Sequence, residues 1–78
     1  MRVLLVEDTL GLGEAVRDQI SDDGHAVDWV QTLSQAQASV QSTQYDLILL
    51  DLMLQYWQGV TWLKRLRRRA AVTPVLSL

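Results

Sequence analysis

The sequence contains no cysteine and only one histidine. Without cysteine the chain forms neither a disulfide bond nor a thiolate metal site, which fits a reducing compartment, and we expect a cytoplasmic protein. A lone histidine makes no metal site on its own. No hydrophobic run approaches the roughly 20 residues that span a bilayer, so we expect no contact with a membrane. Internal repeats and low-complexity linkers are also missing.

The size and charge of the chain limit its organisation. The 78 residues are enough for one small domain, and 49% of them are hydrophobic, which suits a globular core and excludes a disordered chain. The formal net charge of −2 argues against a nucleic-acid-binding surface on this chain.

Two continuous hydrophobic runs end in carboxylates. Residues 47–50 (LILL) have the pattern of a strand buried on both faces of a parallel sheet, and Asp51 follows them directly. Residues 2–6 (RVLLV) form a similar run that ends in Glu7 and Asp8. Ligands and chemistry lie at the carboxyl ends of the strands in an open parallel sheet, so these three carboxylates are candidate site residues. Adjacent carboxylates repel each other and need water, a cation or a basic partner.

The remaining elements alternate between strand and helix. Further strands are expected at 25–30, which His25 and Asp28 mark as a sheet edge, and at 75–78. Hydrophobic spacing predicts three helices. The first passes through Leu12, Val16 and Ile20 and is ended by Gly24; the second follows an N-cap at Ser34 and passes through Ala36 and Val40; the third passes through Val60, Leu63 and Leu66. Short connections between such elements imply right-handed crossovers and a doubly wound parallel α/β sheet.

One segment partly imitates a dinucleotide-binding fingerprint. Gly11 and Gly13 follow a strand and open a helix, and Asp28 lies farther along the chain. However, Val16 occupies the place of the third glycine, and the carboxylates at the end of the preceding strand would repel a pyrophosphate. We therefore rank this alternative low.

Several motifs together resemble the receiver domains of bacterial two-component response regulators. The residues that carry the resemblance are Leu4-Leu5-Val6-Glu7-Asp8, Tyr45-Asp46-Leu47-Ile48-Leu49-Leu50-Asp51-Leu52, Gly59 and Thr73-Pro74-Val75-Leu76. The segment 24–30 (GHAVDWV) resembles in particular the OmpR/PhoB class, which carries a winged-helix DNA-binding domain after the receiver. The resemblance implies a flavodoxin-like fold in which residues 1–78 form a partial receiver, because the last helix-strand-helix and the effector domain lie beyond Leu78.

The resemblance also implies roles for the carboxylates. Asp51 would be the phosphoacceptor, and Mg²⁺ would be held by Glu7, Asp8, Asp51 and the backbone carbonyl of Met53. A carboxylate can attack phosphorus to give an aspartyl phosphate, and Mg²⁺ prefers oxygen ligands. The implied donor is a sensor histidine kinase, and the chain would not be an enzyme, because any phosphoryl turnover would be self-directed.

The chain departs from the receiver pattern at two places. In the loop after Asp51, Gln55 stands where the family has proline and Gln58 where it has an acid, and Tyr56-Trp57 lie between them. The family's phosphoryl-binding Thr or Ser falls one residue beyond Leu78, and its Lys falls later still; Ser77 lies two positions too early for that role.

The predicted function is that of a phosphoacceptor that regulates transcription through a DNA-binding domain outside this chain. A rival hypothesis keeps the fold without the chemistry and makes the chain an interaction or assembly module that uses the loop at residues 55–58. We also expect association, such as a homodimer, through the apolar edge at residues 75–78.

Overall fold

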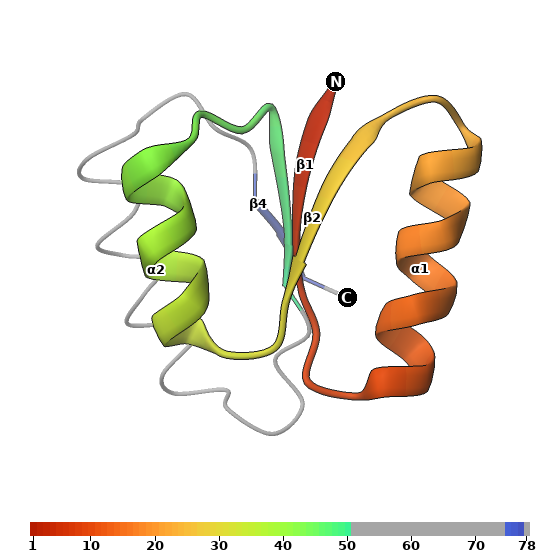
Figure 1. Cartoon of the computed structure of the whole chain (residues 1–78), viewed down its shortest axis with the longest axis horizontal. Helices are drawn as coiled ribbons and strands as arrows, with labels where there is room; N and C mark the ends of the chain where they lie inside the picture. The colour runs from red at the N-terminus through yellow and green to blue at the C-terminus, as the bar shows by residue number, and fades with distance from the viewer. Residues whose placement is uncertain (51–74, 78) are drawn as a thin grey trace.

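Residues 1–50 and 75–77 are described by the computed structural model, and they form a parallel sheet with helices on both faces (Figure 1). The elements follow the order β1 (Arg2–Val6), α1 (Leu10–Asp22), β2 (Ala26–Val30), α2 (Leu33–Ser42), β3 (Leu47–Leu50) and β4 (Val75–Ser77). The strand order is β2-β1-β3-β4, and every pairing is parallel. This arrangement confirms the predicted doubly wound sheet and the edge position of β2; the helix expected through Val60, Leu63 and Leu66 lies outside the described residues.

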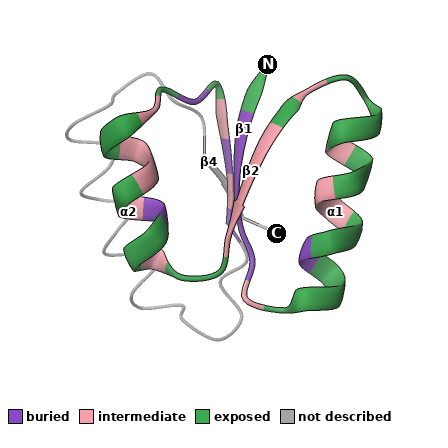
Figure 2. Ribbon diagram, in the orientation of Figure 1, coloured by how far each residue is buried: buried purple, intermediate pink, exposed green. Residues whose placement is uncertain are grey.

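The two hydrophobic runs form the centre of the sheet, as their patterns predict. In β1, Leu4 and Leu5 are fully buried, one on each face, because successive side chains of a strand point to opposite sides. In β3, Ile48 and Leu50 are buried against the α2 face. Figure 2 shows that the buried residues lie mainly in the central strands of the sheet. The main core lies on the α2 face and comprises Leu4, Val6, Ala36, Tyr45, Ile48 and Leu50, with Val30, Leu33 and Val40 packed against it.

Helix α1 covers the other face of the sheet, but in its first turns it buries a different residue from the one predicted. Val16 and Ile20 are partly buried as expected, whereas Leu12 is 46% exposed. The buried residue of the first turns is Gly13, whose backbone lies against the indole ring of Trp29. A side chain at position 13 would overlap the ring of Trp29, so glycine fits this contact, and the neighbouring Leu12 is exposed to solvent.

Helix α2 begins two residues earlier than predicted. Its N-cap is Thr32, whose hydroxyl oxygen accepts a hydrogen bond from the Gln35 amide at 3.1 Å, so the assignment of Ser34 as N-cap is wrong. Ala36 is buried and Val40 partly buried, which confirms the sparse hydrophobic stripe predicted for this helix. No helix in the described part of the chain is long and apolar enough to cross a bilayer.

Candidate functional site

The carboxyl ends of the strands lie together along one edge of the sheet. Val6, the last residue of β1, is the register partner of Val30 in β2 and of Leu50 in β3, and Leu50 is in turn the partner of Ser77 in β4. Glu7 and Asp8 follow Val6 directly, so they lie at this edge beside the end of β3. We call Glu7 and Asp8 the acidic pair.

Glu7 is fully buried and is held by its backbone as well as its side chain. Its amide donates to the Val30 carbonyl at 3.0 Å, and its own carbonyl accepts from Trp29 Nε1 at 3.0 Å. The Thr9 amide donates to Glu7 Oε1 at 2.9 Å. A buried carboxyl group requires such partners, because transfer from water without hydrogen bonds is costly.

The acidic pair fits a hard cation in its chemistry. Asp8 is half-buried, so its carboxylate stays within reach of solvent beside the buried Glu7. Oxygen donors of this kind at one strand end suit Mg²⁺, which keeps several waters and takes few protein ligands. Within residues 1–50 and 75–77, no group of three or more acidic, histidine or cysteine side chains forms a complete metal site. The predicted ligands Asp51 and Met53 lie outside the described residues.

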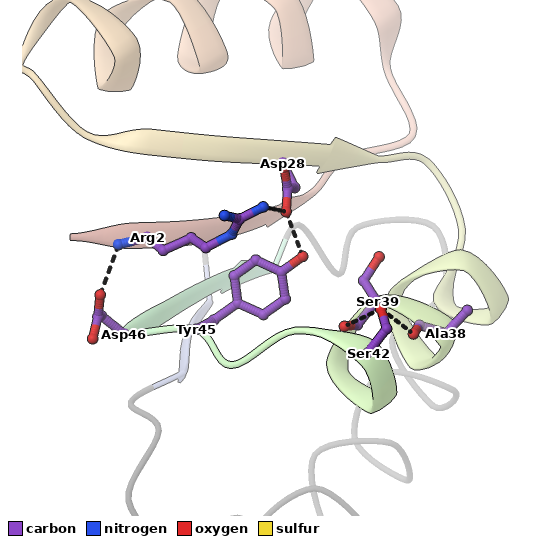
Figure 3. Close-up of polar contacts among 7 residues, drawn as sticks. All are labelled: Arg2, Asp28, Ala38, Ser39, Ser42, Tyr45 and Asp46. Atoms are coloured by element: carbon purple, nitrogen blue, oxygen red, sulfur yellow. Dashed lines mark hydrogen bonds and ion pairs between the residues drawn. The ribbon is translucent and has the colours of Figure 1, made fainter.

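A second polar group lies toward the amino-terminal ends of the strands, on the α2 face (Figure 3). Asp28 Oδ2 accepts hydrogen bonds from Tyr45 Oη at 2.6 Å and from Arg2 Nη2 at 3.0 Å. Arg2 also exchanges bonds with Asp46: its amide donates to Asp46 Oδ2 at 2.7 Å, and its carbonyl accepts from the Asp46 amide at 2.8 Å. These contacts tie β1 to β2 and to the start of β3, so their role is structural.

The hydrogen bond from Tyr45 lowers the pKa of Asp28, and the bond and charge of Arg2 act in the same direction. Burial raises the pKa of Tyr45, and the carboxylate of Asp28 adds to that effect. Asp28 therefore stays ionised as an acceptor between two donors. Gly13, one of the two glycines of the dinucleotide alternative, is packed under the ring of Trp29.

Sequence patterns identified the acidic pair but missed the residues that hold it. No motif in the sequence predicts the hydrogen bond from the ring of Trp29 to the Glu7 carbonyl. Nothing in the spacing of Trp29 and Glu7, which are 22 residues apart, signals that bond, because it depends on the parallel pairing of β1 with β2.

Comparison with known proteins gives one consistent family. The response regulator receiver domain family matches residues 3–78. The response regulator protein PmrA of Pseudomonas aeruginosa is 37% identical over the whole chain, and the transcriptional activator protein IrlR of Burkholderia pseudomallei is 42% identical. The chain spans 35% and 34% of the lengths of these relatives, about a third in each case.

Solved structures support the same family. The non-phosphorylated HemR receiver domain from Leptospira biflexa superposes with a TM-score of 0.87 at 33% identity, covering 97% of this chain and 61% of that one. The MaeR response regulator bound to beryllium trifluoride superposes with a TM-score of 0.86 at 25% identity, covering 100% of this chain and 66% of that one. Matching sequence, strand order and an acidic pair at the end of the first strand place this chain in the response regulator receiver domain family.

Proposed function

We propose that this chain is the phosphoacceptor part of a transcriptional response regulator. Asp51 accepts a phosphoryl group from a sensor histidine kinase, and Glu7, Asp8, Asp51 and the backbone carbonyl of Met53 hold Mg²⁺. The observation that carries the proposal is the position of the acidic pair. It follows Val6, whose register partner Leu50 directly precedes Asp51 in the sequence.

The chemistry follows from the carboxylates. An oxygen of Asp51 forms a bond to phosphorus, the bond from phosphorus to the kinase imidazole nitrogen breaks, and that nitrogen keeps the electron pair and takes up a proton. Mg²⁺, when bound, offsets the negative charge of the phosphoryl oxygens. Glu7 and Asp8 contribute by holding negative charge at a fixed place beside the strand end. Turnover of the phosphoryl group is self-directed, and the chain acts on no separate substrate.

Two relatives support this proposal by their names. IrlR is a transcriptional activator, which fits an output through transcription, and MaeR binds beryllium trifluoride, a small mimic of a phosphoryl group. The effect on transcription would pass through a DNA-binding domain outside this chain.

The test is phosphorylation of the intact protein by acetyl phosphate, followed by intact-mass measurement. We expect wild type to gain one phosphoryl group in the presence of Mg²⁺ and none after chelation with EDTA. Asp51→Asn should gain none. The matched control is Asp46→Asn, which changes an aspartate near the opposite end of β3 and keeps an oxygen that can accept from the Arg2 amide.

Phosphorylation that persists in Asp51→Asn would refute Asp51 as the acceptor. A folded wild type that gains no phosphoryl group from acetyl phosphate or from a histidine kinase would instead support the interaction-module hypothesis.

A further inference from the structure

Trp29 connects three parts of the molecule next to the acidic pair. It lies on the edge strand β2, and its indole Nε1 donates to the Glu7 carbonyl at 3.0 Å. The Arg17 guanidinium of α1 lies 5.4 Å from the centre of the ring. A Cβ atom on Gly13 would overlap the ring at Cζ2 and Cε2, so α1 meets the indole with bare backbone.

The hydrogen bond from Trp29 acts on the peptide group between Glu7 and Asp8. That group is planar, so fixing its carbonyl also fixes its N–H and the direction in which the chain leaves toward Asp8. The preceding peptide group is fixed as well, because the Glu7 amide donates to the Val30 carbonyl at 3.0 Å. Strand β2 therefore holds both peptide groups of Glu7 at the end of β1. Its backbone binds the Glu7 amide, and the side chain of Trp29 binds the Glu7 carbonyl.

A ring used for packing alone would not need its N–H at this place. Phenylalanine would cover the same face of the sheet and could still receive the Arg17 cation on its surface. The indole differs by its single donor, and that donor is used on the backbone of the acidic pair.

We propose that Trp29 is a positioning residue for Mg²⁺: its indole N–H holds the Glu7–Asp8 peptide so that the acidic pair is preorganised for the cation. The inference rests on the proposed function, since it assumes that the acidic pair binds Mg²⁺. Outer-shell groups that orient metal ligands typically change metal affinity by roughly 10- to 100-fold when they are removed.

The first test compares Trp29→Phe with wild type in the intact protein. Calorimetric titration should show Mg²⁺ affinity reduced by roughly 10-fold, at the lower end of that range, because the bond acts on backbone. In phosphorylation by acetyl phosphate, half-saturating Mg²⁺ should rise by a similar factor, while the rate at saturating Mg²⁺ stays within about twofold of wild type. The control is Arg17→Met, which removes the cation over the ring and keeps the N–H bond; its Mg²⁺ dependence should equal that of wild type.

A second variant displaces the same ring from the other side. Gly13→Ala places a methyl group where Cζ2 and Cε2 of Trp29 lie, so the indole must move and its bond to Glu7 should lengthen or break. We expect the same rise in half-saturating Mg²⁺. Trp29→Phe already lacks the N–H bond to Glu7, so adding Gly13→Ala to it should raise half-saturating Mg²⁺ little further, which is the non-additivity expected of two changes that act on one contact.

A spectroscopic signal separates positioning from general stability. The Nε1 proton of Trp29 should shift in the proton NMR spectrum when Mg²⁺ is added, and this shift should be lost in Asp8→Asn. Unchanged Mg²⁺ affinity in folded Trp29→Phe overturns this inference and leaves the proposed function intact. A lower rate at saturating Mg²⁺ with unchanged half-saturation also overturns it, since that result marks a merely structural role. A wild type that binds no Mg²⁺ overturns both.

Discussion

At the scale of single residues, the bond between Tyr45 and Asp28 is the strongest candidate for a local contribution to stability. The Tyr45 ring is 5% exposed and belongs to the core on the α2 face, while its hydroxyl lies 2.6 Å from Asp28 Oδ2. A hydrogen bond to a charged acceptor contributes more than a neutral one. The salt bridge from Arg2 to the same oxygen is exposed to solvent and contributes less.

Tyr45→Phe should therefore lower the free energy of unfolding by about 1–2 kcal/mol at pH 7. The ring and its packing are kept, so the loss reports the hydroxyl alone. Urea unfolding followed by circular dichroism measures the difference. In an Asp28→Asn background the same substitution should cost clearly less, because the charged acceptor is already gone. An equal cost in both backgrounds would show that the hydroxyl acts through another partner.

The same pair makes a pH-dependent prediction. Because the pKa of Asp28 is lowered in the folded protein, its carboxylate adds stability that is fully present above the ordinary aspartate pKa of about 4 and is lost as the pH falls through the lowered value. The difference in unfolding free energy between wild type and Tyr45→Phe should stay constant from pH 7 to about pH 5 and narrow in more acidic solution. Unfolding curves at a series of pH values check this, and a difference that widens with acid would contradict it.

Residue-level chemistry was the hardest part to predict from sequence. Asp28 lies on the predicted edge strand with its side chain 39% exposed, but its partners come from positions 26 residues before it and 17 after it. Such contacts depend on the strand order β2-β1-β3, which brings Arg2 between Asp28 and the start of β3. A local pattern cannot carry that information.

At the scale of elements, the end of α1 was predicted correctly and its geometry explains why. Gly24 has φ +90°, a left-handed conformation that glycine adopts without a Cβ penalty. The Gly24 amide donates to the Ser21 carbonyl at 3.0 Å, and the His25 amide to the Ile20 carbonyl at 3.3 Å. This pair of bonds is the Schellman motif, which ends the helix and turns the chain into β2.

Gly24→Ala should destabilise the protein by about 1 kcal/mol, because alanine pays for the left-handed conformation that glycine adopts freely. Gly11→Ala is the matched control: Gly11 lies in the exposed first turn of α1, and a Cβ there meets nothing within 4 Å. That change should instead stabilise the protein by about 0.5–1 kcal/mol through helix propensity. Thermal unfolding should give a lower melting temperature for Gly24→Ala and a higher one for Gly11→Ala. Melting temperatures that shift in the same direction would contradict a special requirement for glycine at position 24.

The start of α2 shows where element prediction fails. Thr32 and Ser34 are both good N-cap residues, and the sequence offers two hydroxyls two positions apart. The structure selects Thr32, with Leu33 inside the helix and packed against the core. Helix periodicity through Ala36 and Val40 was correct, whereas the boundary depended on a tertiary contact that the pattern does not contain.

At the scale of the whole molecule, the parallel sheet brings separate strand ends to one edge, and this is why the fold and the acidic pair were predictable together. Hydrophobic runs at 2–6 and 47–50 became the central strands, and the carboxylates after the first run lie at the expected edge. The assignments of Asp51 as phosphoacceptor and of Met53 as a ligand stay predictions, as does association through residues 75–78.

If the acidic pair binds Mg²⁺ only in the folded state, binding must stabilise the whole molecule. At free Mg²⁺ 100-fold above its dissociation constant, the gain in unfolding free energy should be about 2.7 kcal/mol by mass action. Thermal unfolding in Mg²⁺ and in EDTA, at equal ionic strength, measures this gain. Asp8→Asn should abolish most of it, whereas Asp18→Asn, an exposed residue of α1 paired with Arg17, should keep it. An equal gain in both variants would mean that Mg²⁺ acts through general screening of the acidic surface, because only a site at the end of β1 distinguishes Asp8 from Asp18.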